Sequence, residues 1–360
     1  MLQRFFSFIL VLFFLLDPAG TWADELKSGY MTVTDGSGRT IFETGHRVEI
    51  GDEFLDEDNQ LYQIISLSGN SAQGRLIKKA ALKNMSYLTA HVPSTVSVLK
   101  PYAIIYQTHT DESYIPTDGQ SEQEGGGSII KVGIALADAL RNYGFEIGHS
   151  GALHDPHDAN AYHRSRRTAL AMMRKHYPSV IIDVHRDSVP LKNYHVVIDG
   201  EEAVKVLLVV GRHNQNREAI QNFAGNIKAV ADNMHPGLIR GIFMAKGNYN
   251  QDLMPRSILL EMGTQYNTLE AAQRSASLIA DTIPTALNLT NAGSSKFNFN
   301  ALFPGFGDGQ KETLWPSGGI TTFFNWQNIL LAFILLLAAL AFWLYFLYGK
   351  FWERLKKWRP

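Results

Sequence analysis

Hydrophobic and polar positions change their spacing along the chain, and the change marks two kinds of predicted structure. Over residues 24–99, apolar and polar residues alternate in short runs separated by turns rich in Gly, Asn and Asp, which is typical of β-strands. Over residues 100–289, apolar runs that suit buried strands alternate with stretches in which apolar residues recur at helical spacing. The first part predicts a small β domain or an extension of a sheet. The second predicts an α/β layered sheet with helices on both faces.

Both ends of the chain carry apolar runs with a different meaning. Residues 1–23 contain one basic residue, followed by an uncharged apolar run that is too short to span a bilayer. The segment ends in small residues of the kind found at cleavage sites, and together these features predict a signal peptide. Residues 329–348 are uncharged and apolar over about one bilayer thickness, which predicts a transmembrane helix within residues 326–348. Aromatic residues near both of its ends suit the two membrane interfaces.

The flanks of that apolar run predict an orientation. The basic tail at residues 349–360 favours the cytoplasm, and residues 290–325 have the composition of a linker. We therefore expect a protein of the cell membrane that crosses it once at its C-terminus. Its catalytic domain would lie outside the cytoplasm, in agreement with an N-terminal signal peptide.

Composition narrows the chemistry that the chain can carry. The formal net charge is −1, with 33 Lys and Arg against 34 Asp and Glu, so no global field favours binding to nucleic acid. There is no Cys, which excludes disulfides, thiol nucleophiles and thiolate metal sites. A metal would have to be held by histidine, carboxylate or backbone oxygen.

Residues that can bind a metal or carry a proton follow three of the predicted apolar strands. One strand runs into His109 and Glu112, a second into His185, and a third ends on Glu261. Ligand sites of α/β sheets lie at the carboxyl ends of strands, so we expect these side chains to meet. A catalytic zinc takes three protein ligands and keeps one open position, and His109, Glu112 and His185 supply that number. Glu261 is then the candidate carboxylate that moves a proton to the leaving amine.

One alternative ligand set exists, and the other histidines have simpler interpretations. His154 could take the place of Glu112 as the third ligand. His157 and His163 lie in the same polar segment and are expected in solvent, and His46 is expected on the surface of the β region.

Other charged residues near the predicted site could support it. Asp183 and Asp187 lie two residues before and after His185, hence on its face of the strand, and either could orient a ligand or form an ordinary ion pair. Arg166 could bind a peptide carboxylate or belong to a charged helix face. The loop over residues 117–128 is flexible by composition and could either line a substrate groove or be an ordinary solvated loop.

Five separated blocks stand in a recognisable order over about residues 100–286. They are THTDESY (108–114), LHDPHDANAYHRSRRT (153–168), IIDVHRD (181–187), NYNQDLMPRSILLEMG (248–263) and NTLEAAQRSA (267–276). Together they resemble the stage II sporulation protein P family. The resemblance implies an amidase-like fold and a zinc-dependent N-acetylmuramoyl-L-alanine amidase, which cuts the amide between the muramic acid lactyl group and L-alanine.

The resemblance also implies roles for residues and partners. Residue by residue, it places metal ligands at His109, Glu112 and His185 and the catalytic base at Glu261. Asn250, inside the fourth block, is a further candidate for substrate contact or ligand support. The implied setting is removal of septal peptidoglycan during engulfment in sporulation, at the membrane and beside other engulfment proteins that include a lytic transglycosylase.

The sequence departs from the family pattern at two points, and it is compatible with two alternative functions. Family members often have an N-terminal anchor, whereas this chain is predicted to be anchored at its C-terminus. The family block HTHxxES has Gln107 in place of its first histidine; Gln107 and His109 would share one side of an extended segment, so the change matters only if that histidine binds metal. The alternatives are a metallo-endopeptidase acting on stem-peptide cross-links and a non-catalytic protein of cell-wall binding or assembly.

Overall fold

The computed structural model describes residues 25–26, 28–79 and 100–287, which lie in one compact unit built around a mixed sheet of eleven strands. The order across the sheet is β2-β1-β5-β4-β3-β12-β11-β13-β8-β6-β7. The strands of this sheet are β1 (Met31–Thr34), β2 (Thr40–Thr44), β3 (Glu53–Leu55), β4 (Gln60–Ser68), β5 (Ser71–Lys79), β6 (Tyr102–Tyr106), β7 (Glu146–His149), β8 (Val180–Asp187), β11 (Val206–Gly211), β12 (Ile239–Ala245) and β13 (Ser257–Thr264). A separate hairpin is formed by β9 (His195–Ile198) and β10 (Glu201–Val204).

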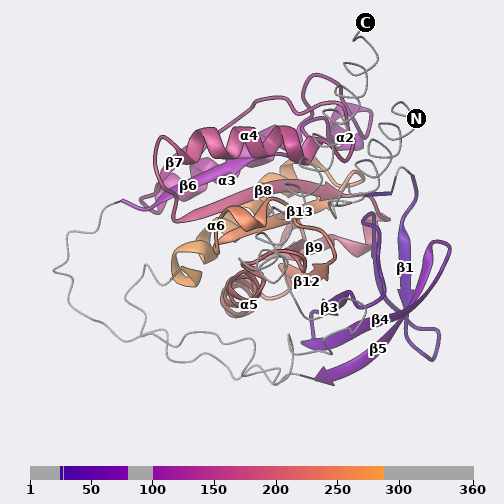
Figure 1. Cartoon of the computed structure of the whole chain (residues 1–360). Helices are drawn as coiled ribbons and strands as arrows, with labels where there is room; N and C mark the ends of the chain where they lie inside the picture. Colours follow the sequence, from indigo (N-terminus) through magenta and orange to yellow (C-terminus); the bar gives the residue numbers. More distant parts are fainter. Residues whose placement is uncertain (1–24, 27, 80–99, 288–360) are drawn as a thin grey trace, which may run out of the picture. The chain divides into compact units, whose positions relative to one another are not determined.

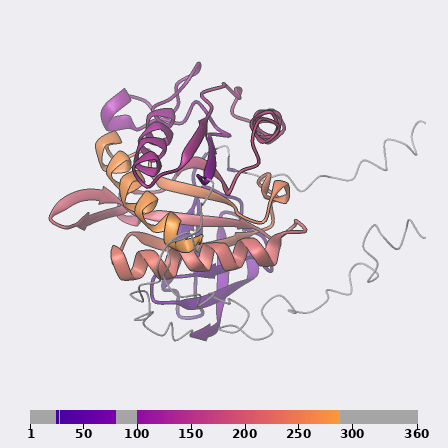
Figure 2. The same cartoon turned by 90° about the vertical axis from the view of Figure 1, so that its left-hand side faces the viewer.

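The helices cover the two faces of the sheet unequally. They are α2 (Ile115–Asp118), α3 (Ile129–Asn142), α4 (Ala161–Met173), α5 (Arg217–Met234) and α6 (Leu269–Ala286), with short 3-10 turns η1 (Leu191–Asn193) and η2 (Gln251–Leu253). Helix α6 packs between α3 and α5 on one face, whereas α4 lies on the opposite face (Figures 1 and 2). Ala169 and Met172 of α4 pack there against Ile104 of β6 and Ile181 of β8. The expected α/β sheet with helices on both faces is confirmed.

Strand direction determines where polar side chains can gather. Strands β13, β8, β6 and β7 are neighbours and run parallel, whereas β11 runs antiparallel to β13. The carboxyl ends of β13, β8 and β6 therefore meet at one edge. Within β8, side chains alternate between faces, so Asp183, His185 and Asp187 lie on the same face as Ile181, the face that α4 covers.

The strands before residue 80 extend this sheet instead of forming a separate β domain. Strand β3 pairs antiparallel with β12, with Phe54 opposite Phe243, so the edge of the α/β sheet continues into β4, β5, β1 and β2. These strands also curl over the α4 face. Met31, Val33 and Phe42 bury their side chains with Leu207 of β11 and Leu259 of β13. The loop after β2 consequently lies close to the carboxyl end of β8.

Four predicted segments lie outside the described residues: the signal peptide at 1–23, the linker at 290–325, the transmembrane helix at 326–348 and the basic tail at 349–360. Within the ranges that the structure describes, none of the helices combines the length and the apolar character needed to cross a bilayer.

Gly241 allows the close junction between β3 and β12. A Cβ atom on Gly241 would lie 2.8 Å from the ring of Phe54 and would also meet the backbone oxygen of Leu55. We expect Gly241→Ala to lower the free energy of unfolding by about 1–3 kcal/mol, because a backbone contact cannot yield as a flexible side chain can. Urea denaturation of both proteins measures this difference.

Gly151→Ala is the matched control for Gly241→Ala. The nearest heavy atom to a Cβ on Gly151 is 4.0 Å away, so the midpoint should hardly move. Equal midpoints for wild type and Gly241→Ala would show that the junction tolerates the methyl group.

Candidate active site

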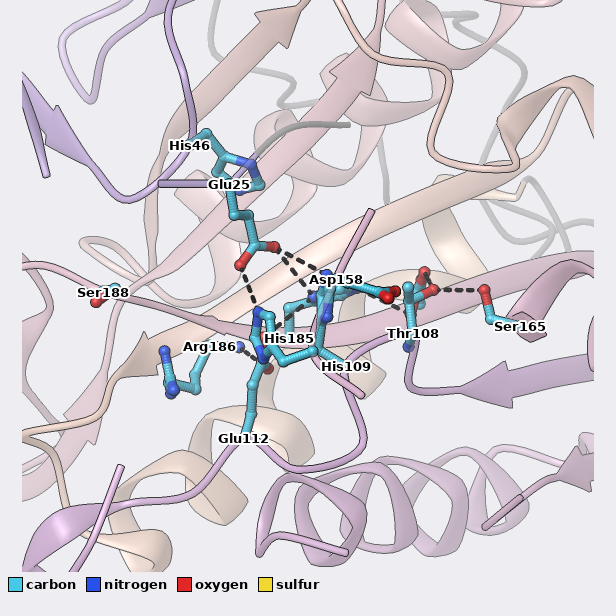
Figure 3. A network of polar contacts seen from close by, with 12 residues as sticks. Glu25, His46, Thr108, His109, Glu112, Asp158, Ser165, His185, Arg186 and Ser188 are labelled. Carbon is cyan, nitrogen blue, oxygen red and sulfur yellow. Dashed lines mark hydrogen bonds and ion pairs between the residues drawn. The ribbon is translucent and has the colours of Figure 1, made fainter. Parts of the chain in front are cut away.

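The predicted ligands come together at the shared carboxyl ends of β6 and β8. His109 and Glu112 follow β6, and His185 lies within β8. The His109 and His185 rings are edge to face with centroids 5.3 Å apart, and Oε1 of Glu112 lies 3.4 Å from Nδ1 of His185. All three side chains are at most 3% exposed. Figure 3 shows them pointing toward one another, with the carboxylate of Glu25 reaching in from a different segment.

His109 has the state that a metal ligand needs. Burial lowers the pKa of His109 well below its ordinary value, against the opposing charge of Glu25, so the imidazole is neutral near pH 7. Neither of its ring nitrogens has a hydrogen-bond partner among the described residues. The ring stacks on His157, with centroids 3.9 Å apart, and meets Tyr162 edge to face. The ring is thus fixed by packing while its nitrogens remain available.

His185 is oriented by a carboxylate behind it. Its Nε2 lies 3.1 Å from Oδ1 of Asp183, and its Nδ1 lies 3.4 Å from Oε1 of Glu112, so each ring nitrogen faces one carboxylate. Asp183 is held in turn by Thr108, whose backbone N–H and hydroxyl donate to its two oxygens at 2.8 and 2.6 Å. Burial lowers the pKa of His185, but the charges of Asp183 and Glu112 raise it well above its ordinary value. Metal binding at Nδ1 would therefore displace a proton.

Backbone hydrogen bonds hold Glu112 in place. Its Oε2 accepts from the backbone N–H of Arg186 at 2.8 Å, which leaves Oε1 directed at His185. The loop that follows α2 returns to this segment: the N–H of Gln123 donates to Asp111 at 2.7 Å, and that of Gly127 donates to Thr110 at 2.7 Å. The loop over residues 117–128 therefore makes backbone hydrogen bonds to the segment that carries His109 and Glu112.

Glu25 brings a second carboxylate to the same place. Its Oε1 lies 3.4 Å from Nε2 of His109 and 3.9 Å from Nδ1 of His185, and its Oε2 lies 3.2 Å from Nε2 of His157. Leu26 donates its N–H to the oxygen of Gly45, so Glu25 is tied to the loop after β2. One oxygen of Glu25 thus faces the two predicted imidazole ligands.

His157 is a charged partner of Glu25, in contrast to the expectation of a solvated side chain. Both ring nitrogens face carboxylate oxygens, those of Asp111 at 3.0 Å and Glu25 at 3.2 Å, so both donate. Burial lowers the pKa of His157, but these hydrogen bonds raise it to about 11. As an imidazolium it holds Glu25 rather than a metal.

Glu261 lies beside His185 and pairs with a histidine that the sequence had placed on the surface. In the sheet, Glu261 of β13 is the register neighbour of His185. Nε2 of His46 donates to Oε1 of Glu261 at 2.7 Å, and the two side chains are 2% and 1% exposed. The expectation of a surface His46 is wrong, because the loop after β2 carries it over the sheet into the site.

Three further candidates that could support the site, Asp187, Arg166 and Asn250, all have other partners. Asp187 accepts from the N–H of Gly45 at 2.6 Å, so it anchors the loop that carries His46. Arg166 forms a two-point ion pair with Asp252, both contacts at 2.7 Å, which occupies its fork. Asn250 donates to the oxygen of Tyr162 at 3.0 Å and fixes α4.

His154 and Gln107 are both directed away from the ligands. His154 donates from Nδ1 to the oxygen of Gln107 at 2.6 Å and accepts at Nε2 from Thr168 at 2.8 Å. With both nitrogens engaged, this geometry favours Glu112 over His154 as the third ligand. The Gln107 side chain lies against Gly133 of α3, so the chain bends before His109 and the two residues do not share a side.

These residues fit a divalent metal such as zinc on the evidence of their unpaired atoms. Both nitrogens of His109, both nitrogens of His185 and Oε1 of Glu112 are buried without hydrogen-bond partners within the described part of the chain. Buried polar atoms are seldom left so. Ligand atoms of Glu25, Glu112 and His185 all lie within 4.8 Å of one another, and His109 belongs to a second such group with Glu25 and His157. A bound cation would pair these atoms and offset the repulsion between the carboxylates.

Sequence reasoning missed Glu25, His46 and His157 for different reasons. His157 lies inside the second recognised block, which was the signal that could have marked it, but its partners Asp111 and Glu25 are distant in sequence. Glu25 and His46 lie in a region that read as ordinary alternating strands, and their role depends on how the sheet curls.

Comparison with known proteins gives a family and one curated relative. The family model described as Stage II sporulation protein P matches residues 52–284. Stage II sporulation protein P of Bacillus subtilis (strain 168) is 32% identical over 207 residues, which cover 51% of this chain. The match spans 50% of that relative, so the chain spans about half the length of the curated relative.

Solved structures of similar arrangement include two amidases. The CwlD amidase from Clostridioides difficile, in complex with the GerS lipoprotein, has a TM-score of 0.37 and 11% identity, covering 52% of this chain and 98% of that one. N-acetylmuramoyl-L-alanine amidase AmiC2 of Nostoc punctiforme has a TM-score of 0.32 and 14% identity, covering 53% of this chain and 96% of that one.

Removing the charge of Glu25 tests its place in the ligand group. We expect Glu25→Gln to weaken zinc binding by at least about tenfold, because two unit charges ~4 Å apart near a protein surface attract by roughly 4 kcal/mol. Competition with a chelating dye measures the dissociation constant. Glu124→Gln removes an exposed charge from the nearby loop and should leave that constant unchanged. Equal affinities for wild type and Glu25→Gln would place Glu25 outside the metal site.

Proposed function

This chain belongs to the stage II sporulation protein P family, and from that premise we propose that it is a zinc-dependent peptidoglycan hydrolase. The bond that it cleaves is the amide between the lactyl group of muramic acid and the L-alanine of the stem peptide. One observation carries the proposal: the unpaired atoms of His109, Glu112 and His185 converge on the sheet face that also presents Glu261. Two imidazoles, a carboxylate ligand and a separate carboxylate suit the hydrolysis of an amide.

His109, Glu112 and His185 would hold the zinc. When bound, zinc would polarise the scissile carbonyl and make a water molecule nucleophilic near neutral pH. The contribution of this chain is to arrange its ligands beforehand. Asp183 lies behind Nε2 of His185, which would leave Nδ1 for the metal, and the N–H of Arg186 fixes the carboxylate of Glu112.

Glu261 would move the proton. Burial raises the pKa of Glu261 to about 7, against the hydrogen bond and charge of His46 that lower it. A carboxyl group with a pKa near the working pH can both accept and return a proton efficiently. Glu261 therefore accepts a proton from the attacking water and delivers it to the departing alanine nitrogen. Its Oε2, which is without a hydrogen-bond partner among the described residues, is the oxygen available for this transfer.

The setting is also part of the proposal. The enzyme would be held in the cell membrane by residues 326–348 with its catalytic domain outside the cytoplasm, and would act on septal peptidoglycan during engulfment. Its partners would be other engulfment proteins, including a lytic transglycosylase. The apolar and basic composition of the C-terminal residues supports this topology, and family membership supports the role in sporulation.

Digestion of peptidoglycan tests the reaction. The full chain, purified in detergent and loaded with zinc, is incubated with purified peptidoglycan, and the products are identified by mass spectrometry. Wild type should release stem peptides with a free L-alanine amine. We expect Glu261→Gln to lower kcat by about 10²–10⁴-fold with zinc retained, because it removes the proton carrier and leaves the ligands intact. His185→Ala should lose both activity and zinc.

Glu270→Gln, which changes an exposed carboxylate at the start of α6, should behave as wild type. Cleavage only between stem-peptide amino acids would identify an endopeptidase instead. Equal rates for wild type and Glu261→Gln would remove Glu261 from the mechanism.

A further inference from the structure

His46 and Glu261 form a buried pair that joins the beginning of the described chain to its last strand. His46 lies in the loop after β2, and Glu261 lies in β13, 215 residues later. Their contact of 2.7 Å is shielded from solvent on both sides, since neither side chain is more than 2% exposed. A carboxylate cannot donate a hydrogen bond, so the proton lies on Nε2 of His46.

The loop that carries His46 is fixed by contacts independent of Glu261. The N–H of Gly45 donates to Oδ1 of Asp187 at 2.6 Å, and the oxygen of Gly45 accepts from Leu26 at 2.9 Å. A Cβ atom on Gly45 would lie 3.0 Å from both Asp187 and Ser188, so the backbone can approach β8 this closely only with glycine. The imidazole stands edge to face with Tyr249, with centroids 6.0 Å apart. His46 is therefore placed before it meets Glu261.

Because of this pair, the two carboxylate oxygens of Glu261 differ in their hydrogen bonding. Oε1 accepts from His46, whereas Oε2 is buried without a hydrogen-bond partner in the described part of the chain. A buried carboxylate with neither oxygen engaged would be costly and free to rotate about its last torsion. We propose that His46 is a positioning residue for Glu261: it holds Oε1 so that Oε2 is the oxygen presented to the substrate and its water.

This assignment rests on the proposed function, because it requires Glu261 to be the proton carrier. It comes from the geometry and not from the family match, which begins at residue 52, after both Glu25 and His46. The contacts of Gly45 and the ring packing would persist without Glu261, whereas Oε1 of Glu261 would lose its hydrogen bond without His46. A positioning role therefore predicts an effect on turnover that passes through Glu261.

Three variants of the full chain test the proposal: His46→Phe, which fills the space without a donor, His46→Gln, whose amide can donate to Oε1, and the double variant His46→Phe with Glu261→Gln. Soluble muramyl-peptide fragments give kcat and KM, and zinc content and Tm are measured for each protein. We expect His46→Phe to lower kcat by about 10- to 100-fold with KM and zinc content retained, as small misplacements of reacting groups do.

Rescue and non-additivity separate positioning from a structural role. His46→Gln should keep kcat within several-fold of wild type, and His46→Phe should cause no further loss in the Glu261→Gln background. His195→Ala, an exposed histidine on β9, is the control and should match wild type.

Several results would overturn the assignment of His46 as a positioning residue. The proposal is overturned if His46→Phe keeps wild-type kcat while Glu261→Gln is impaired, or if the loss is equal in both backgrounds. It is also overturned if the loss accompanies release of zinc and a lowered Tm that His46→Gln does not repair. If wild type and Glu261→Gln turn over equally, Glu261 carries no proton, and the proposed function fails together with the role of His46.

Discussion

The arrangement of the site depends on one buried carboxylate, that of Asp187. It is 3% exposed, and it accepts from the N–H of Gly45, from its neighbour Ser188 and from the hydroxyl of Tyr194. The guanidinium of Arg240 lies 3.4 Å away and stacks over the Tyr194 ring. Removing one partner of such a buried pair typically costs about 3–5 kcal/mol, so the contact is strongly specified. Through Gly45, it fixes the loop that brings His46 to Glu261 and Glu25 to His109.

Much of the α/β sheet and part of the site follow from local sequence patterns. Apolar runs predicted β6, β8 and β13, and the rule that ligands gather at carboxyl ends predicted that His109, Glu112 and His185 would meet. The prediction held because these three strands are parallel neighbours, so their carboxyl ends, and the residues that directly follow β6, lie at one edge of the sheet. The position of Glu261 near His185 could be predicted for the same reason. The choice between Glu112 and His154 needed the hydrogen bonds of both side chains, which spacing alone does not encode.

The remainder depends on tertiary curvature. His46 lies in a stretch of alternating polar and apolar residues. Such a pattern predicts which side chains are buried, but it does not predict against which part of the protein they pack. Only the pairing of β3 with β12, and the curling of β1 and β2 over β11 and β13, turn that loop toward the site. Arg166 illustrates the opposite error. Its guanidinium suited a substrate carboxylate, yet Asp252, distant in sequence, already occupies it.

The span between His46 and Glu261 also determines when the site can exist. Glu25 and His46 leave the ribosome early, whereas β13 is the last strand of the described sheet to be synthesised, so the pair cannot form until the chain through β13 is complete. Until β13 is in place, His109, Glu112 and His185 have no Glu261 beside them, and the buried contact of His46 cannot form. The complete arrangement of this site is therefore a property of the finished fold, and it exists only once the whole sheet has closed.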